Sequence, residues 1–338
     1  MKWYSDTRSN GIVLSTRVRL ARNVKGYPFG KKISQEQRAD LIKEVRYAFE
    51  KFGTDRYNYM DMSSKSQIEK SLLVEEHIIS PEFASLAPSE SSMLVYDENN
   101  SVSVMIGEED HIRIQSIKAG FALKEAYDIA DAIDNMLSQG LEFSYDDSLG
   151  YLTCCPSNTG TGLRISCMVH LPMLTRNDYM KSVIEYCTRS GLTVRGFFGE
   201  GSRADGEIYQ ISNQITLGIS EEETAKRIEE VITTIVNKEA TLRAQLKSAS
   251  ESVKDKLWRS YGILSKARCI DSKEFLSLLS DCILGKECGI LTDLNDNNLV
   301  RMLIECMPAH LINADPKCKD PSHRDVFRAE RIRNMLKV

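Results

Sequence analysis

The sequence predicts an α+β fold in which an antiparallel β-sheet flanked by helices is followed by an all-helical C-terminal domain. Short alternating or β-branched runs, punctuated by glycine and typical of strands, fill the chain before about residue 220. After Ser220, which has Glu223 three residues on as in a capping box, the pattern is almost wholly helical. The chain has 338 residues, enough for about two domains. We therefore expect one domain at residues 1–243 and a second at residues 244–338, each with a core of its own.

Five segments of the first part have the composition of strands. They are GIVLSTRVRL, SVSVMI, HIRIQ, LRISCMVHL and EIYQISNQITLG. Two helices are expected among them. One is capped by Ser34, with Gln37 three residues on, and the other runs from about Lys118 to Leu137.

The composition excludes several classes of function. The 48 acidic residues against 44 basic ones give a net charge of -4, so no overall field draws the chain to nucleic acid or to a membrane surface. The sequence has no run of about 18 apolar residues, which a transmembrane helix needs. Nine cysteines without a C-x-x-C pair, and a start without a signal peptide, are typical of reduced thiols. We therefore expect a cytoplasmic protein.

Arginine recurs on the polar face of the predicted strands. Side chains two residues apart along a strand share a face. In the first strand the polar face carries Ser15, Arg17 and Arg19, and the other face carries Leu14, Val18 and Leu20. In LRISCMVHL the apolar face carries Leu163, Ile165, Cys167 and Val169. Its polar face carries Arg164, Ser166, Met168 and His170.

The segment SVSVMIGEEDHIRIQ places three acids directly after an apolar run. Its even positions are predicted to lie in the core: Val102, Val104, Ile106, Ile112 and Ile114. The open face would then carry Glu109, His111, Arg113 and Gln115. Glu108 and Asp110 break the alternation, so we expect a bend or bulge there.

Two interpretations of these polar faces are open. Antiparallel sheets often carry solvated arginines on one face, and a run of acids is usually a solvated turn. Guanidinium groups converging from several strands would instead suit a polyphosphate, which they bind with paired hydrogen bonds. Carboxylates beside such a site supply a base for a nucleophile and an outer sphere for magnesium. The common phosphate loops, G-x-x-x-x-G-K-[ST] and a G-x-G-x-x-G between strand and helix, are absent from the sequence.

Five separated blocks carry a resemblance to a known family. They are STRVRLARN, GEEDHIRIQ, CPSNTGTGLR, RGFFGEGS and ISNQ, in this order between about residues 12 and 240. Together they resemble the phosphagen (guanidino) kinases, which move the γ-phosphoryl group of ATP to a guanidinium nitrogen. The resemblance implies the guanidino kinase catalytic fold, with ATP and Mg²⁺ as cofactors.

Two features favour the branch of that family whose substrates are arginine side chains of proteins. Arg17 and Arg19 lie almost at the N-terminus, whereas small-molecule members look to have a helical domain of roughly a hundred residues before this pair. The segment RDVFRA, which begins at Arg324, resembles the phosphoarginine-recognition motif of that branch. The resemblance also implies a homodimer, a possible activator protein and a role in marking proteins for a Clp-type protease.

The resemblance assigns nucleotide-binding roles to residues of this chain. Five arginines are implied to clamp the ATP phosphates, with His77 near the nucleotide. These arginines are Arg17, Arg19, Arg113, Arg164 and Arg195. The other residues of the implied nucleotide-binding segments are Ser15, Thr16, Val18, Ile165, Ser166, Cys167, Met168, Gly196, Phe197, Phe198 and Gly199.

Acids and a thiol complete the implied site. Glu109 would orient and deprotonate the substrate guanidinium, with Glu200 as its partner on a mobile loop and Cys155 as the thiol that contacts the same group. A guanidinium with a pKa above about 12 is a poor nucleophile until carboxylates fix its tautomer and accept its proton. Glu108 and Asp110 would hold magnesium through water.

The sequence departs from the family pattern at two positions. Gly107 stands where the family usually has Asn, which leaves the geometry of the loop before Glu109 open. Phe198 stands where the small-molecule members have another arginine, although the protein-arginine branch also looks to place an aromatic residue there.

The last predicted helix carries a second candidate site. Arg324 and Arg328 are one turn apart, and Asp325 lies about 100° round the helix. Two cations and a carboxylate complement phosphoarginine, which predicts an allosteric phosphoarginine-binding site. The alternative is a solvated amphipathic helix in which Asp325 pairs with Arg328 at i+3.

The expected function is an ATP- and Mg²⁺-dependent kinase that phosphorylates exposed arginine side chains of proteins. One alternative is a kinase of free arginine or another small guanidino compound. Another is a catalytically silent phosphoarginine-binding adaptor, against which the presence of Glu109, Glu200, Cys155 and all five arginines argues. Direct contact with nucleic acid or membrane is not expected.

Overall fold

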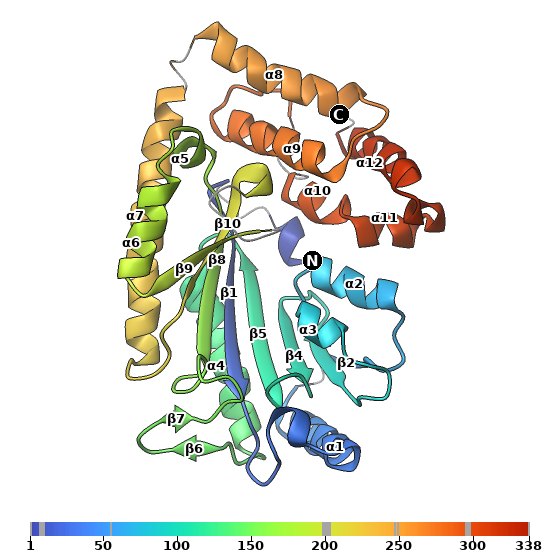
Figure 1. The fold of residues 1–338 in the computed structure, drawn as a ribbon, viewed down its shortest axis with the longest axis vertical. Helices are drawn as coiled ribbons and strands as arrows, with labels where there is room; N and C mark the ends of the chain where they lie inside the picture. The colour runs from blue at the N-terminus through green and yellow to red at the C-terminus, as the bar shows by residue number, and fades with distance from the viewer. Residues whose placement is uncertain are drawn as a thin grey trace.

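An eight-stranded β-sheet forms the centre of the computed structural model, which describes residues 2–6, 11–54, 56–197, 204–246, 248, 250–294 and 299–336 (Figure 1). Its strands are β1 (Val13–Arg22), β2 (Tyr57–Asp61), β3 (Met93–Asp97), β4 (Val102–Ile106), β5 (Ile112–Ala119), β8 (Leu163–His170), β9 (Leu192–Gly196) and β10 (Ile208–Asn213). Their order is β2-β3-β4-β5-β1-β8-β10-β9, and every neighbouring pair is antiparallel. The predicted antiparallel sheet is therefore confirmed. A separate short hairpin is formed by β6 (Tyr145–Asp146) and β7 (Gly150–Tyr151).

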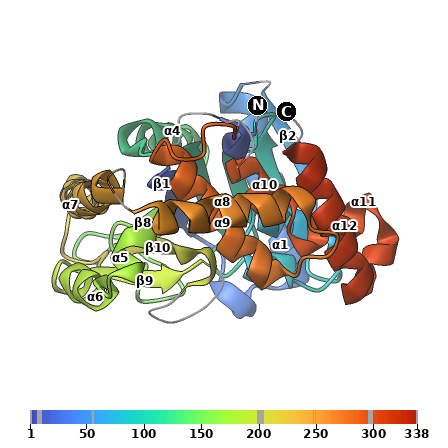
Figure 2. The same ribbon diagram turned by 90° about the horizontal axis from the view of Figure 1, so that it is seen from above.

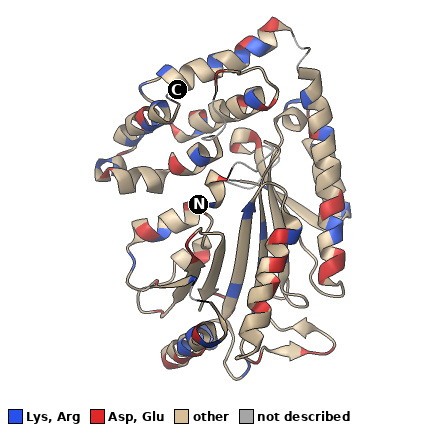
Figure 3. Cartoon of the chain, turned by 180° about the vertical axis from the view of Figure 1, so that it is seen from behind, with Lys and Arg blue, Asp and Glu red and all other residues tan. Residues whose placement is uncertain are grey.

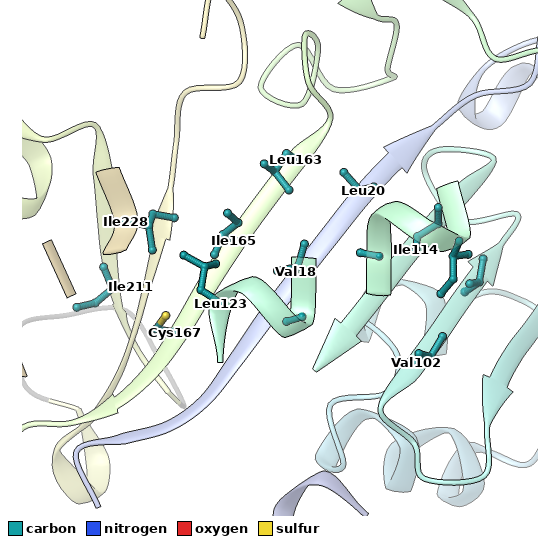
Figure 4. Packing of buried hydrophobic residues seen from close by; sticks show 14 of the residues in the cluster. Val18, Leu20, Val102, Ile114, Leu123, Leu163, Ile165, Cys167, Ile211 and Ile228 are labelled. Carbon is teal, nitrogen blue, oxygen red and sulfur yellow. The ribbon is translucent and has the colours of Figure 1, made fainter. Parts of the chain in front are cut away.

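Helices from the first part of the chain cover one face of the sheet. They are α1 (Gln35–Phe52), α4 (Leu123–Ser138), α5 (Pro172–Arg176), α6 (Met180–Arg189) and α7 (Glu221–Leu246). Their apolar residues pack on inward-facing strand residues such as Val18, Ile114 and Ile165 in one buried cluster (Figure 4). Because side chains alternate along a strand, the predicted apolar residues lie on the sheet face that these helices cover.

The predicted helix starts are confirmed at two places and corrected at a third. Ser34 and Gln37 form a complete capping box at the start of α1, and Glu223 bonds Ser220 in the same way before α7. The helix expected from Lys118 begins only at Leu123, because β5 continues to Ala119. Gly120, with a φ of +68°, ends the strand.

The opposite face of the sheet is covered by an N-terminal turn, by two helices between β2 and β3, and by the C-terminal helices. Against it lie a 3-10 turn at Trp3–Ser5 and the helices α2 (Gln67–Glu75) and α3 (Pro81–Ala84). The C-terminal helices are α8 (Glu251–Lys266), α9 (Ser272–Glu287), α10 (Leu299–Glu305), α11 (Pro308–Ala314) and α12 (Pro321–Met335). Seen from above, α8 and α9 cross the end of the sheet, with α7 to one side (Figure 2). Across the described residues, no helix has both the length and the apolar character needed to cross a membrane.

One buried cluster joins the C-terminal helices to the sheet. Met105 and Met168 of the sheet lie in the same cluster as Phe275 and Leu303 of the helices. Apolar residues on this face of the strands are therefore covered by the helical region.

A β-bulge near the start of β1 changes the predicted face of one residue. Val13 is opposite Val169, whereas Ser15 is opposite Met168, so Leu14 is the extra residue. Leu14 consequently packs in the cluster with the C-terminal helices and not with Val18 and Leu20, as the simple alternation predicts.

The acidic run GEEDH forms the turn between β4 and β5. Ile106 is opposite Ile112, and Gly107 N donates to His111 O at 2.9 Å, so the expected bend is a full reversal. Gly107 has a φ of +86°, a region open to glycine and, less readily, to Asn. His111 is not on the open face as expected, because its buried ring accepts a hydrogen bond from Val24 N at 3.0 Å.

Candidate active site

Arginines from three central strands converge on the sheet face that is turned away from α1 and α4. Arg19 of β1 is opposite Arg164 of β8, and Ala21 is opposite Arg113 of β5. Arg17 precedes Arg19 by two residues on β1 and therefore lies on the same face. Basic residues stand out on these otherwise mostly uncharged strands (Figure 3). The predicted convergence of Arg17, Arg19, Arg113 and Arg164 is thus present in the fold.

The next strand supplies polar partners to two of these arginines. Arg17 Nη2 donates to Gln210 Oε1 at 2.8 Å, and Arg164 Nη2 donates to Ser212 Oγ at 3.1 Å. Gln210 and Ser212 both lie on β10, two residues apart and therefore on one face. Strand alternation along EIYQISNQITLG, which places residues two apart on one face, would have found both residues.

Glu108 pairs with Arg113, but no carboxylate of the described residues forms an ion pair with Arg17, Arg19 or Arg164. Burial, and then the neighbouring guanidinium groups, lower the pKa of Arg17 to about 10 and the pKa of Arg19 and Arg164 below their usual range. The Nε atoms of Arg19 and Arg164 are buried with no hydrogen-bond partner among the described residues. Such unpaired buried cations need an anion with several acceptor oxygens. The cluster therefore fits a triphosphate.

A cavity of about 400 Å³ lies over the cluster. Its polar lining residues are Arg17, Arg19, Glu75, His77, Ser80, Glu82, Arg113, Gln115 and Gln210. Its apolar lining residues are Val74, Ile79, Pro81, Met105, Phe197, Ile304 and Met307. A cavity lined by both arginines and apolar side chains suits a nucleotide, which carries both phosphates and a base.

His77, one of the lining residues, has both aromatic and cationic neighbours. Its ring centroid is 5.9 Å from that of Trp3 and 5.1 Å from that of Phe197. Burial, and then the charges of Arg17 and Arg19, lower the pKa of His77 to about 3, so its imidazole is neutral. His77 has a φ of +60°, and Gln115 Nε2 donates to its carbonyl oxygen at 2.7 Å.

Arg195 approaches the site from the edge strand. It is opposite Gln210 in the pairing of β9 with β10, so its side chain is on the arginine face. Arg195 is exposed and adds to the lowering of the pKa of Arg164. Gly196 follows it at the end of β9. Phe198, Gly199 and Glu200, predicted to bind nucleotide or substrate, lie outside the described residues.

Alternation divides the side chains of the predicted nucleotide-binding segments between the two faces of the sheet. Val18, Ile165 and Cys167 lie in the core on the other side of the sheet. Thr16 lies with them, and its hydroxyl donates to Gly120 O at 2.7 Å. Their side chains cannot reach the cavity, because neighbours along a strand point to opposite faces. Ser15, Ser166 and Met168 share the arginine face.

A second, smaller cavity of about 160 Å³ adjoins the first. The two cavities share Arg19 and Arg113 in their linings, and the second adds Glu109 and Cys155. Cys155 Sγ is 2.9 Å from Ser157 Oγ. Burial, and then the charge of Asp110, raise the pKa of Glu109. A carboxyl group with a raised pKa is better matched to accepting a proton near neutral pH than a free one.

The two acids predicted to hold magnesium have different surroundings. Glu108 accepts hydrogen bonds from Arg113 Nη1, at 2.9 Å, and from the hydroxyl of Ser80. Asp110 is buried, and its Oδ1 accepts from Asn23 Nδ2 at 2.8 Å and from Cys154 N at 2.7 Å. Asp110 thus joins three chain segments and lines none of the cavities described above, whereas Glu108 stands beside the arginines.

No group of three metal-type ligand atoms gathers at these cavities in the described part of the chain. The one such group comprises Asp315, Cys318 and His323, near the start of α12. Near the arginines, Glu108 offers carboxylate oxygens of the kind that Mg²⁺ prefers.

Cys154 and Cys155 are neighbours with different environments. Cys154 lines a third cavity, of about 800 Å³, on the far side of Glu109. Burial, and then the charges of Asp110 and Glu109, raise the pKa of Cys154 to about 11. Cys154 is therefore a protonated thiol, while Cys155 shares the small cavity with Glu109 and Arg164.

The segment RDVFRA lies in α12, where it is tied to neighbouring elements. Arg328 is fully buried and donates to Cys306 O at 3.1 Å, Ile270 O at 2.8 Å and Ser272 Oγ at 2.9 Å. It also pairs with Asp325 at 2.5 Å, the i+3 pair of the alternative interpretation. The helix is not solvated at this pair as that interpretation requires. Arg324 is half-buried, and its Nη1 donates to Cys318 O at 3.4 Å.

Comparison with known proteins places the chain in a family. The model of the ATP:guanido phosphotransferase C-terminal catalytic domain matches residues 40–242, and that of the protein-arginine kinase McsB C-terminal domain matches residues 250–338. A protein-arginine kinase of Clostridium kluyveri is 39% identical over 98% of this chain and 97% of its own length. One of Geobacillus thermodenitrificans is 40% identical over 97% of this chain and 91% of its own length.

Solved structures show the same fold. The duplicated taurocyamine kinase of Schistosoma mansoni, with bound transition-state-analogue components, has a TM-score of 0.62 and 28% identity over 74% of this chain, which spans 37% of that kinase. Lombricine kinase has a TM-score of 0.61 at 24% identity over 71% of both chains, a likeness of fold alone. The chain therefore belongs to the ATP:guanido phosphotransferases and, among them, to the protein-arginine kinase family.

Proposed function

We propose that this chain transfers the γ-phosphoryl group of ATP to arginine side chains of proteins. The observation that carries the proposal is the pair of adjoining cavities that share Arg19 and Arg113. A phosphoryl group held at the shared arginines faces the cavity that contains Glu109 and Cys155. Donor and acceptor would then meet in line, and positioning of this kind is a large part of phosphoryl-transfer catalysis.

The arginines bind and orient the phosphates in this proposal. Arg17, Arg19, Arg113 and Arg164, with Arg195 at the edge, offer paired donors to the phosphate oxygens. Their positions are fixed by the strands before ATP arrives, so little reorganisation is needed as charge develops on the transferred group. Mg²⁺ bound with the nucleotide would add positive charge at the phosphate oxygens, and Glu108 is the carboxylate best placed for its water shell.

Glu109 and Cys155 act on the acceptor. Glu109 accepts the proton of the attacking guanidino nitrogen, whose new bond to phosphorus replaces the bond between the γ-phosphorus and its bridging oxygen. Cys155 contacts the same guanidino group and helps to orient it. Glu200 remains the predicted second carboxylate for this group.

The surroundings of Glu109 favour a polypeptide acceptor. Glu109 also lines the third cavity, of about 800 Å³, which is larger than the other two. Its lining includes Glu82, Glu90 and Glu108. A cavity of this size leaves room for the residues on either side of a target arginine in a polypeptide. Free arginine has no such neighbours and would not need this room. The homodimer, the activator, the cytoplasmic location and the link to a Clp-type protease remain parts of the proposal that the family resemblance supports.

One assay tests the proposal. The purified chain is incubated with ATP, Mg²⁺ and either casein or free arginine, and acid-labile phosphate is measured. We expect phosphate on casein and little on free arginine. Transfer to free arginine alone would favour a small-guanidine kinase. Binding of phosphoarginine without any transfer would favour the adaptor.

A further inference from the structure

The nucleotide cavity has a wall that the catalytic part of the chain does not supply. Ile304, near the end of α10, and Met307, just before α11, both line it. They belong to its apolar lining, together with Val74, Ile79 and Met105. The base of a nucleotide would contact this apolar lining, because the arginines bind its phosphates.

The attachment of α11 to α2 holds this wall in place. The carboxylate of Glu75 accepts hydrogen bonds from Ala309 N at 2.7 Å and His310 N at 3.1 Å, at the start of α11. It also pairs with His310 Nδ1 at 2.8 Å. Three interactions of one half-buried carboxylate therefore fix the first turn of α11, which directly follows Met307.

The next residue extends the attachment to the N-terminal segment. Glu76 lies 3.4 Å from His310 Nε2, and its carboxylate accepts from Tyr4 at 3.0 Å and from Lys2. Trp3 Nε1 donates to the carbonyl oxygen of Glu76 at 2.8 Å. Glu75 and Glu76 thus bind the C-terminal helices and the N-terminal turn, and His77, which follows them directly, lines the nucleotide cavity.

We propose that the C-terminal helical region is part of the nucleotide site, with Ile304 and Met307 binding the base and Glu75, Glu76 and His310 holding those two residues in position. This inference rests on the proposed function, since it requires a nucleotide in the cavity. Because binding free energies are linked, a nucleotide that contacts α10 and α11 strengthens their docking, and whatever loosens that docking weakens nucleotide affinity. The coupling needs no long-range pathway, since the two parts share one cavity.

Calorimetry with two probes tests the assignment. A non-hydrolysable ATP analogue offers both a base and phosphates to the cavity, whereas inorganic tripolyphosphate offers phosphates alone. We expect Met307→Ala to weaken binding of the analogue by roughly tenfold, the loss for one apolar side chain, and to leave tripolyphosphate binding unchanged. Ile263→Ala, at an exposed apolar residue of α8, is the control and should change neither.

Hydrogen exchange on the wild type provides a readout that needs no variant. We expect the ATP analogue to slow exchange of the amides in residues 299–314, and tripolyphosphate to leave them unchanged. His310→Gln should reduce the protection by the analogue. Equal affinity of Met307→Ala and wild type for the analogue, without protection of α10 and α11, would overturn the inference while leaving the proposed function intact. A wild type that binds tripolyphosphate but no nucleotide would overturn both.

Discussion

Glu108 and Arg113 form an ion pair across the β4–β5 turn, with 2.6 Å between Glu108 Oε2 and Arg113 Nη1. The first acid of the GEED run therefore already balances one of the arginines that face the phosphate cavity. Asp110, two residues on, accepts from Asn23 and from the backbone of Cys154 through Oδ1, while its buried Oδ2 has no hydrogen-bond partner among the described residues. Glu108 and Asp110 are both predicted to hold magnesium through water. Because their surroundings differ, substitutions at the two positions should have different effects.

The first prediction separates these acids. Glu108→Gln should raise the Mg²⁺ concentration needed for half-maximal activity and change the melting temperature little, because Gln can still accept from Arg113. Asp110→Ala should lower the free energy of unfolding by about 1–3 kcal/mol, since two buried donors lose their acceptor. Magnesium titrations and thermal melts of both variants check this. An unchanged magnesium requirement in Glu108→Gln would remove Glu108 from the metal shell.

The second prediction concerns Glu109. Glu109→Gln should retain nucleotide affinity and lose phosphoryl transfer by at least about a hundredfold, the scale of a positioned general base. The pKa of Glu109 is raised, so the wild type should lose activity on the acid side at a higher pH than the value of about 4.3 for a free Glu would give. Rate measurements from acid to neutral pH, with calorimetry of nucleotide binding, test both statements. Turnover close to wild type in the variant would contradict the assignment.

The third prediction concerns the thiols beside the site. Cys155→Ser should reduce activity, while Cys154→Ser should leave it nearly intact, because only Cys155 lines the small cavity with Glu109. Limited alkylation followed by mass spectrometry should label Cys155 before Cys154, whose pKa is raised to about 11. Exposed Cys269 serves as the reference for simple accessibility. Labelling of Cys154 ahead of Cys155 would place the wrong thiol in the site.

The fourth prediction is a pH dependence of stability at His310. Burial alone would lower the pKa of His310, but hydrogen bonds to Glu75 and Glu76 raise it above its ordinary value. Glu76, with its pKa lowered to about 2 and with Lys2 and Tyr4 beside it, stays charged. The stabilisation by protonated His310 is therefore fully present below about pH 6.5 and is lost as the pH rises through the folded-state pKa.

Thermal melts of wild type and His310→Gln across this range test the sign. The difference in melting temperature should be largest at the acid end and shrink as the pH rises. A difference that stays constant with pH would mean that His310 stabilises α11 only as a neutral hydrogen-bonding group.

Strand alternation accounts for what the sequence predicts well about this site. Because side chains alternate with a period of two, Arg17, Arg19, Arg113 and Arg164 could be assigned to one face from the sequence. The same rule fails at Leu14, where a bulge inserts one residue, and at His111, which lies in a turn outside the alternation. Local irregularities of this kind are set by contacts between strands, which the pattern of one strand does not contain.

The residues that the sequence could not predict come from distant parts of the chain. Ile304 and Met307 reach the nucleotide cavity only because the helical region packs on the sheet. Helical periodicity likewise predicts that Arg324 and Arg328 are near one another. It does not predict which elements cover them. The burial of Arg328 depends on Ile270, Ser272 and Cys306, which lie elsewhere in sequence.

That burial decides how the predicted phosphoarginine site must be tested. Arg328→Ala should lower the free energy of unfolding by about 3–5 kcal/mol, because it removes one partner of a buried pair and leaves several acceptors unmatched. Loss of ligand binding in that variant would say nothing about recognition. Arg324 is half-buried with one long hydrogen bond, so Arg324→Ala should fold normally.

Phosphoarginine binding should therefore depend on Arg324 without a change in stability. We expect Arg324→Ala to weaken phosphoarginine binding by at least roughly tenfold, since it removes a charge-assisted pair with the phosphate. Arg259→Ala, at an exposed arginine of α8, should bind like the wild type. Both are titrated by calorimetry with the nucleotide cavity filled by a non-hydrolysable ATP analogue, so that the main arginine cluster cannot bind the ligand. If Arg324→Ala binds phosphoarginine as tightly as the Arg259 control, or if the wild type binds none, the polar network around Arg328 serves only to hold α12 against the loop before α9.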